Sequence, residues 1–196
     1  MHGGNTISLL SKYWKYNRRV FDIMNTALNL SPRPATMAMK KTGKKNIVAV
    51  EVGVFYGDNA RSILRTLDIE HLYLVDPYKT YTCGGFEVKI DDKILKEAKR
   101  KLKPWKDKIS WVHKYSDIAI YEIPDADFIY LDANHDYEFI TKDLSLYYPK
   151  VKVGGILASH DFKCFHLGVI KAAVEFTNIH KLSLNAEPDD CWMVKP

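Results

Sequence analysis

The stretch VAVEVGVFYGDNARSIL, residues 48–64, joins an apolar run to a glycine-containing turn and an amphipathic segment. Ile47 to Val52 is almost entirely apolar and rich in β-branched side chains, which is typical of a strand buried on both faces. Asp58 to Leu67 carries apolar residues at helical spacing. The stretch therefore predicts a central strand that leads through a tight turn into a helix, the opening unit of a parallel α/β sheet.

The turn has the spacing E-x-G-x-x-x-G, formed by Glu51, Gly53 and Gly57. Glycine permits a sharp bend and the close approach of a ligand, and the free amides of the following helix point at that ligand. The dinucleotide-binding fingerprint is G-x-G-x-x-G, which this turn does not match. Glu51 is poorly suited to a pyrophosphate and better suited to a cationic amino group. Taken alone, the loop is also compatible with a plain strand-to-helix turn.

The rest of the domain alternates between apolar runs and amphipathic segments, which predicts right-handed crossovers and helices on both faces of a sheet. The last two strands are separated by too few residues for a crossover helix, so we expect an antiparallel C-terminal hairpin. The fold class is therefore α/β, with a Rossmann-like, seven-stranded, mostly parallel sheet and extra N-terminal helices. The expected strands are 47–52, 72–75, 109–113, 127–131, 155–159, 182–184 and 192–194, and the expected helices are 58–67, 86–102, 117–121, 137–148 and 168–178.

The length of 196 residues fits one main domain, and 46% apolar with 27% charged residues is ordinary for a globular protein. We divide the chain into an N-terminal helical extension, residues 1–45, and an α/β domain, residues 46–196. Ser8 to Leu30 has apolar residues at helical spacing and predicts one or two helices that cover the active site or mediate dimerisation. No apolar run approaches the roughly 20 residues of a membrane span, and we expect no signal peptide.

Charge and cysteine content narrow the partners only slightly. The net charge of +5 is mild and by itself neither indicates nor excludes nucleic acid. The lysine-rich segment 89–103 is interpreted as a solvated helix face, so we expect no nucleic-acid partner. Cys83, Cys164 and Cys191 form no C-x-x-C motif and cannot all pair, which predicts reduced thiols and a cytoplasmic location.

Asp76 follows the second expected strand, in the sequence Asp76-Pro77-Tyr78. A carboxylate at this place can accept hydrogen bonds from both hydroxyls of a ribose. Asp76 lies 23 residues after Gly53, close to the spacing of about 20 residues for the acidic partner in dinucleotide folds. An aspartate before proline is also a common turn former. Together with the glycine turn, the ribose interpretation is favoured.

The fourth and fifth expected strands end in the motifs DANHDY and SHDF. The carboxyl ends of neighbouring parallel strands meet at one edge of a sheet, so we expect Asp132, His135, His160 and Asp161 in one small volume. Carboxylates and imidazole can hold a divalent cation that lowers the pKa of a substrate hydroxyl, and a neutral histidine can accept the proton. The structural alternatives are that Asp132 is a buried acceptor, His160 a core histidine and Asp136 a helix N-cap.

Four motifs on successive strand ends, VAVEVGVFYGDNARSIL, HLYLVDPY, ADFIYLDANHDY and KVGGILASHDF, resemble those of the class I S-adenosylmethionine-dependent methyltransferases. Within that class the chain is most similar to the small-molecule O-methyltransferases of the macrocin and cephalosporin pathways, and more distantly to catechol O-methyltransferase. The resemblance covers residues 46–196. It implies S-adenosylmethionine as cofactor and methylation of a hydroxyl on a sugar, phenol or natural product.

The resemblance also implies roles for individual residues. Asp132, His160 and Asp161 match metal ligands, so Mg²⁺ or Mn²⁺ is an additional expectation, and His135 matches a proposed base that acts beside Asp132. An acidic residue commonly stands at the place of His160, and the histidine reduces the negative charge and leaves room for a softer metal or none. Ser116 matches an adenine contact, with helix capping as its alternative. The expected cofactor-binding residues are Glu51, Gly53, Phe55, Gly57, Asn59, Asp76, Ser116 and Asp132.

Other functions stay open at this point. A methyltransferase acting on a macromolecule is one, although base-methylating enzymes carry an N/D-P-P-Y motif where this chain reads Asp132-Ala133-Asn134-His135. A non-catalytic module that binds the cofactor and a partner is another, and a dehydrogenase is a third. We expect a small-molecule acceptor, no membrane contact and a homodimer. Tyr78 to Phe86 is interpreted as a mobile lid over the substrate, with a disordered loop as the alternative.

Overall fold

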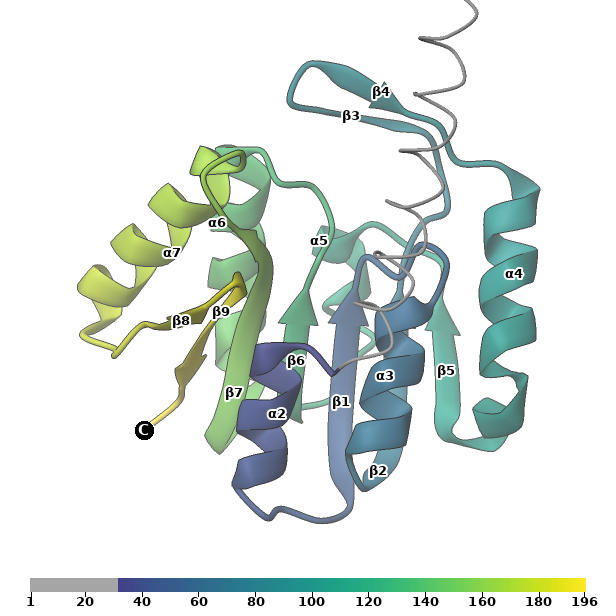
Figure 1. Cartoon of the computed structure of the whole chain (residues 1–196), viewed down its shortest axis with the longest axis horizontal. Coiled ribbons are helices and arrows are strands. Elements are labelled where there is room, and N and C mark those ends of the chain that lie inside the picture. Colours follow the sequence, from purple (N-terminus) through teal and green to yellow (C-terminus); the bar gives the residue numbers. More distant parts are fainter. Residues whose placement is uncertain (1–31) are drawn as a thin grey trace, which may run out of the picture. The chain divides into compact units, whose positions relative to one another are not determined.

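Seven strands form one sheet in the computed structural model, which describes residues 32–196 (Figure 1). The sheet order is β5-β2-β1-β6-β7-β9-β8, and a separate two-stranded hairpin pairs β3 (Tyr81–Cys83) with β4 (Phe86–Val88). The strands of the sheet are β1 (Ile47–Val52), β2 (Ile69–Val75), β5 (Ile109–Val112), β6 (Ala126–Leu131), β7 (Val151–Phe162), β8 (Asn185–Glu187) and β9 (Asp189–Val194). The helices are α2 (Pro34–Lys41), α3 (Asp58–Thr66), α4 (Asp92–Leu102), α5 (Ser116–Ala119), α6 (Tyr137–Tyr147) and α7 (Leu167–His180), with short 3₁₀ turns at Lys103–Lys108 and Tyr148–Lys150.

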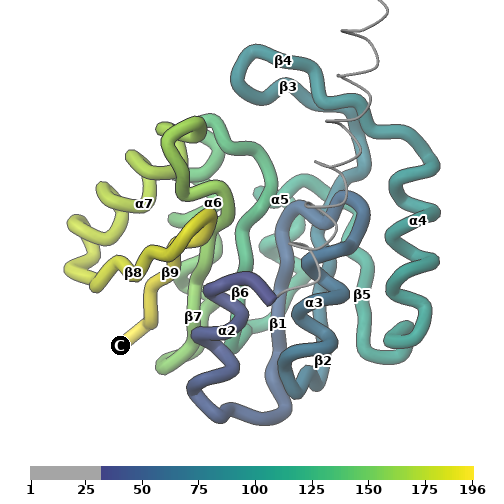
Figure 2. Tube along the Cα trace, in the orientation of Figure 1, coloured from purple at the N-terminus to yellow at the C-terminus, as the bar shows by residue number. Residues whose placement is uncertain are grey.

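The strand directions confirm the expected fold class. β1 lies at the centre and pairs in parallel with β2 and β6, and β5 and β7 extend the sheet in parallel on the two sides. β9 runs antiparallel to both β7 and β8, which makes the C-terminal hairpin. The trace in Figure 2 shows how the chain reverses its progress across the sheet after β5 and continues from β1 through β6. This reversal places a switch point at the carboxyl ends of β1 and β6, where open α/β sheets bind ligands.

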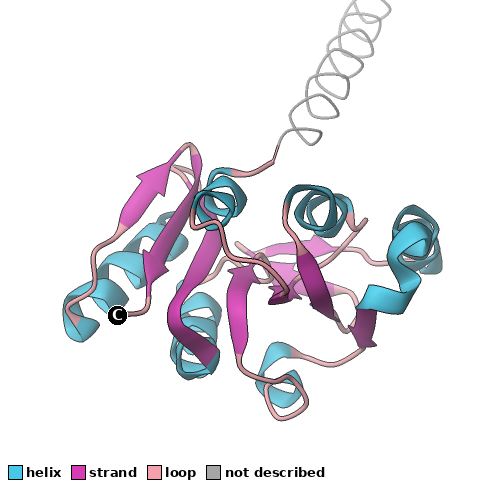
Figure 3. Ribbon diagram, turned by 90° about the horizontal axis from the view of Figure 1, so that it is seen from below, coloured by secondary structure: helices cyan, strands magenta, loops and turns pink. Residues whose placement is uncertain are grey.

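Helices cover both faces of the sheet, as the view from below in Figure 3 shows, and one apolar core lies between the sheet and the helices on each face. The helices α2, α3 and α4 pack on one face, and α5, α6 and α7 on the other. β1 supplies both cores, because Ala49 and Val50 point to opposite faces and are both fully buried. This explains why the strand reads as a continuous apolar run instead of an alternating one.

Several expected element boundaries were wrong. The strands expected at 72–75, 155–159 and 192–194 are longer and span Ile69–Val75, Val151–Phe162 and Asp189–Val194. The segment expected to be one helix over 86–102 begins with a strand, because Gly84 and Gly85 adopt positive φ and turn β3 (Tyr81–Cys83) back onto β4 (Phe86–Val88). α4 begins only at Asp92, where the Asp91 carboxylate accepts hydrogen bonds from the amides of Lys93 and Ile94 and caps the helix. The strand expected at 182–184 lies instead at 185–187.

The described chain begins just before α2, a helix that the sequence did not indicate. Pro34 occupies the first turn of α2, where proline is favoured. Ala35 and Met39 are fully buried against the sheet. The helices expected within 8–30 lie outside the described residues.

Candidate active site

The glycine turn brings β1 and β6 unusually close at the edge of the sheet. Gly53 has φ +87°, and a Cβ built there would lie 2.1 Å from the carbonyl oxygen of Asp132. The Gly53 amide donates to Val75 O at 2.8 Å, and the Asp132 amide donates to Val52 O at 2.7 Å. Glycine is therefore required at residue 53 by both conformation and space, and Gly57 (φ +73°) starts α3 from the left-handed region.

Glu51 lies under this turn and is 1% exposed. Asn59, on the first turn of α3, donates its Nδ2 to Oε1 of Glu51 at 2.8 Å. Glu51 Oε2 and Asn59 Oδ1 are buried and have no hydrogen-bond partner among residues 32–196. Burial raises the pKa of Glu51 to about 8, against the bond from Asn59 and the charge of Arg33, which lower it. Two orphaned acceptors beside a glycine turn are a fitting place for the hydrogen-bond donors of an ammonium group.

Asp76 shapes the same turn from the end of β2. Its Oδ2 accepts the amides of Val54 and Phe55, both at 2.9 Å, and its Oδ1 accepts the Tyr78 amide at 2.7 Å. The Tyr78 hydroxyl in turn donates to Phe55 O at 3.0 Å. The bond to Tyr78 is the turn that an aspartate before proline indicated, whereas the support of the Val54 and Phe55 amides was not evident from the sequence. A carboxylate offers about four lone-pair positions, so three amide bonds leave room for a ribose hydroxyl.

The third loop gives a mixed outcome. Ser116 begins α5, but the N-cap is Tyr115 and no side chain caps this helix, so the capping alternative for Ser116 was wrong. The Ser116 carbonyl accepts the Tyr147 hydroxyl at 2.9 Å, which fixes the loop against α6.

In the fourth loop, Asp136 precedes α6 as its N-cap residue, yet its carboxylate accepts the Gly84 amide of the β3–β4 hairpin at 2.8 Å instead of capping the helix.

The fourth and fifth loops meet as expected. His135 Nε2 lies 3.4 Å from Asp132 Oδ1 and 3.2 Å from Asp161 Oδ2. His160 Nε2 lies 3.6 Å from Asp161 Oδ1. Burial alone would lower the pKa of His135, but Asp132 and Asp161 outweigh it and raise that pKa. The four residues therefore form one cluster at the carboxyl ends of β6 and β7.

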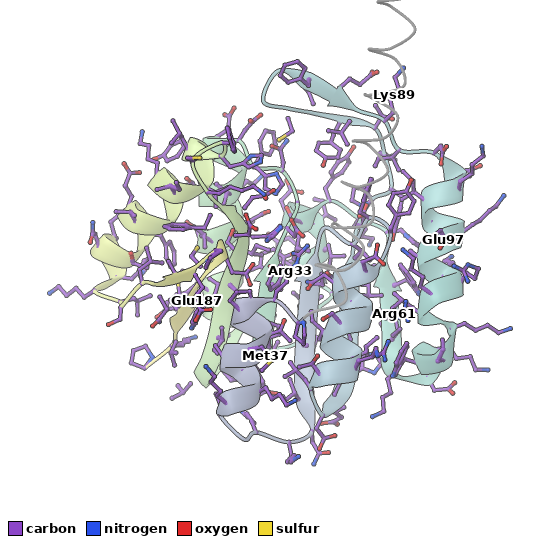
Figure 4. The ribbon with its side chains drawn as sticks, in the orientation of Figure 1. Arg33, Met37, Arg61, Lys89, Glu97 and Glu187 are labelled. Carbon is purple, nitrogen blue, oxygen red and sulfur yellow. The ribbon has the colours of Figure 1, made fainter. Side chains whose placement is uncertain are left out.

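Arg33 is the largest addition that the sequence did not indicate. It lies just before α2 (Figure 4). Its Nη1 donates to Asp132 Oδ2 at 2.7 Å and to the Tyr130 hydroxyl at 2.9 Å. Burial would raise the pKa of Asp132, but the charge of Arg33 and the contact with His135 hold it at about 2. Asp132 is therefore ionised, and its Oδ1 stays directed toward His135.

Three more residues complete the cluster. Asp190 is 0% exposed and accepts the Tyr130 hydroxyl at 2.5 Å and the Ala35 amide at 3.0 Å. Lys163 Nζ lies 2.5 Å from Asp161 Oδ1, and His166 Nε2 lies 3.6 Å from Asp161 Oδ2. No sequence motif marks these side chains, because they reach the site from loops and a strand outside the four motifs.

The family model of a methyltransferase domain matches residues 50–162, more than half of the chain and the whole span from the glycine turn to the SHDF motif. The chain belongs to this methyltransferase family. It is a class I S-adenosylmethionine-dependent methyltransferase, with the seven-stranded sheet and antiparallel C-terminal hairpin of that class. Arg33 and Asp190 lie outside the matched span of the methyltransferase domain.

Individual relatives of this methyltransferase are distant. The uncharacterized protein R132 of Acanthamoeba polyphaga mimivirus is 27% identical over 126 residues, which cover 61% of this chain and about half (53%) of that protein. Cofactor-bound Rv0187 from MTB has a TM-score of 0.62 at 10% identity, over 82% of this chain and 77% of that one. The O-methyltransferase NovP has a TM-score of 0.60 at 18% identity, over 82% and 76%. Similarity at these identities shows the fold alone. Within residues 32–196, the methyltransferase has no helix long and apolar enough to cross a bilayer.

Proposed function

We propose that this methyltransferase transfers the methyl group of S-adenosylmethionine to a hydroxyl of a small molecule. The observation that carries the proposal is the Asp132–His135–Asp161 cluster, because it places an imidazole between two carboxylates at the ligand-binding edge of the sheet. An oxygen nucleophile must lose its proton as it reacts, and an imidazole beside two carboxylates can accept that proton. A sugar, phenol or natural product is the proposed acceptor class.

The cofactor residues keep the roles that their positions suggest. Glu51 and Asn59 would bind the amino group, Asp76 the ribose, Ser116 the adenine, and the turn with Gly53, Phe55 and Gly57 would lie along the methionine and ribose. The reaction is an in-line displacement, in which the acceptor oxygen forms a bond to the methyl carbon while the carbon–sulfur bond breaks and S-adenosylhomocysteine leaves. Most of the rate enhancement would come from holding the three atoms in line.

His135 is the proposed base. Its Nε2 is buried and lies 3.4 Å from Asp132 Oδ1 and 3.2 Å from Asp161 Oδ2, so a proton taken from the acceptor hydroxyl would be held between two carboxylates. Asp132 and Asp161 stabilise the imidazolium that results, by their charge and proximity. Asp132 itself is kept ionised by Arg33.

The donor set also fits a divalent cation. One oxygen of Asp132, one of Asp161 and a nitrogen of His160 all lie within 4.8 Å of one another. Arg33 occupies Asp132 Oδ2 and leaves Oδ1, and His160 directs Nε2 toward Asp161. A cation held by Asp132, His160 and Asp161 would lower the pKa of the acceptor hydroxyl.

Glu51 gives cofactor binding a pH signature. Its pKa of about 8 keeps it largely protonated near pH 7, and an ammonium partner favours the charged form, so binding should release close to one proton. Calorimetry in buffers of different ionisation enthalpy measures that number. The Glu51→Gln variant should release correspondingly fewer protons and bind about 10-fold more weakly. Equal proton release by the two proteins would exclude the ammonium role.

Asp76→Ala tests the second loop. Removal of the carboxylate leaves the amides of Val54 and Phe55 without an acceptor and removes any contact with the ribose. We therefore expect cofactor affinity to fall by about 10- to 100-fold. Isothermal titration calorimetry with S-adenosylhomocysteine measures the loss. Asp107→Ala is the matched control. Asp107 lies in the turn before the amino end of β5, at the opposite edge of the sheet from the site, and this variant should bind the cofactor normally. Unchanged affinity in folded Asp76→Ala would rule out the ribose role.

Metal dependence is tested by chelation. We expect a strong chelator to abolish methylation of a responsive acceptor and to leave S-adenosylhomocysteine affinity nearly unchanged, since the metal and cofactor residues overlap only at Asp132. Restoring divalent cations should restore turnover. Full turnover in chelator would eliminate the metal and leave the methyltransferase assignment intact.

Two other functions remain candidates with distinct outcomes. A module that binds the cofactor without catalysis would form no S-adenosylhomocysteine with any acceptor, and an enzyme for macromolecules would methylate only polymeric substrates. A small-molecule acceptor, a homodimer and the absence of nucleic-acid and membrane partners are part of the proposal. So is a cytoplasmic location, which the three free thiols favour.

A further inference from the structure

His160 is held from behind by a buried carboxylate. Its Nδ1 lies 3.0 Å from Asp190 Oδ1, and its Nε2 faces Asp161. Asp190 is wholly buried and is itself fixed by the Tyr130 hydroxyl and the Ala35 amide. With Nδ1 donating to Asp190, Nε2 carries the lone pair and is directed into the cluster. A carboxylate that orients the far nitrogen of an imidazole is the usual arrangement around a metal-bound histidine.

The distances between donor atoms match those around a small cation. His160 Nε2 lies 3.6 Å from Asp161 Oδ1, and His135 Nε2 lies 3.2 Å from Asp161 Oδ2. Adjacent ligands at about 2.1 Å from one ion are about 3.0–3.5 Å apart. Two groups of three residues have ligand atoms that all lie within 4.8 Å of one another, Asp132 with His160 and Asp161, and His135 with Asp161 and His166, and they share Asp161. The cluster therefore contains three imidazoles and two carboxylates that could bind a cation.

Charge decides which ions such a centre favours. Arg33 already neutralises Asp132, and Lys163 lies 2.5 Å from Asp161, so little net negative charge is left for a hard ion. Mg²⁺ binds oxygen ligands and keeps most of its waters. Imidazole nitrogen forms stronger bonds to Mn²⁺, Fe²⁺, Co²⁺ and Zn²⁺, in rising order along that series in general.

We propose that this centre selects a divalent first-row transition-metal ion over Mg²⁺, with His160 as the selecting ligand and Asp190 as the residue that positions it. The inference rests on the proposed function only for the place of the cation. Binding itself needs neither cofactor nor acceptor, so it can be measured on the resting protein.

Direct metal binding tests the inference. The probes are Mn²⁺, Zn²⁺ and Mg²⁺ alone, titrated into the full chain in a Cys164→Ser background that removes an exposed thiol. We expect one Mn²⁺ or Zn²⁺ per chain at an affinity at least 100-fold above that of Mg²⁺. Pulsed electron paramagnetic resonance of bound Mn²⁺ should show coupling to imidazole nitrogen. No metal binding by folded protein, or Mg²⁺ affinity within 10-fold of Mn²⁺, would overturn the proposal.

Three variants assign the ligand and its support. His160→Asp should shift the Mn²⁺-to-Mg²⁺ affinity ratio toward Mg²⁺ by at least 10-fold, and His160→Asn should reduce the nitrogen coupling while the circular dichroism stays native. Asp190→Asn should weaken Mn²⁺ and Zn²⁺ about 10- to 100-fold. His180→Gln, an exposed imidazole at the end of α7, is the control and should bind metal normally. An unchanged ratio in His160→Asp together with unchanged nitrogen coupling in His160→Asn would refute the ligand role.

The tests of metal selectivity and of methyl transfer have distinguishable outcomes. Selective metal binding without methylation of any hydroxyl acceptor would support this centre and defeat the proposed acceptor chemistry. Methylation at full rate by protein that binds no transition metal would do the reverse.

Discussion

Asp132→Asn is expected to lower the rate of methyl transfer by about 10²- to 10³-fold, because the carboxylate both faces His135 and belongs to the proposed cation site. Loss of its charge leaves Arg33 without its ionic partner and makes the imidazolium of His135 harder to form. Steady-state kinetics with a responsive acceptor measures the effect. Cofactor affinity should change much less than turnover.

The matched control is Asp68→Asn, at the amino end of β2, where the side chain pairs only loosely with Lys45 at 4.0 Å. This variant should retain turnover within about twofold, since an exposed pair contributes little. Near-normal turnover in Asp132→Asn would exclude Asp132 from the chemistry and shift the proposed site toward Asp161.

Gly53→Ala is expected to destabilise the fold by about 3 kcal/mol or more. The added methyl would sit 2.1 Å from Asp132 O, which is backbone and cannot turn aside, and the residue must also keep φ +87°. Any relief requires β1 and β6 to separate at the active edge, so cofactor affinity should fall as well. Urea unfolding and calorimetry measure the two effects.

Gly43→Ala separates conformation from crowding. Gly43 also has positive φ (+71°), but no atom lies within 4 Å of its added Cβ. Its alanine variant should cost only the conformational strain, about 1–2 kcal/mol. If both variants lost the same stability, the close approach of Asp132 to Gly53 would have no energetic weight.

The Asp132–Asp161 cluster differs from a site built mainly of carboxylates in two ways. Arg33 and Lys163 offset the negative charge of the two aspartates. His135, His160 and His166 add nitrogen donors to the carboxylate oxygens.

The four motifs predicted most of the fold because their signals are local. A strand buried on both faces must be apolar throughout, and a turn that lets β1 approach β6 must contain glycine, so Gly53 and its surroundings are legible in the sequence. The boundaries of β4 and α4 were harder to predict from the sequence. The same residues 86–91 carry enough apolar and charged side chains for a helix, and only the Gly84–Gly85 turn and the Asp91 cap decided against it.

The sequence by itself determined the order of strands and helices, the glycine turn, and the placement of Asp76, Asp132, His135, His160 and Asp161 at one edge of the sheet. These follow from periodicity and from the rule that parallel strands end together. Only the tertiary structure decided that Arg33 pairs with Asp132, that Asp190 holds His160, and that His166 approaches Asp161. Those contacts join residues 99, 30 and 5 positions apart. His160 and Asp190 are register partners in the antiparallel β7–β9 pair, and Arg33 reaches Asp132 from the segment before α2, so strand register and helix packing set these partners.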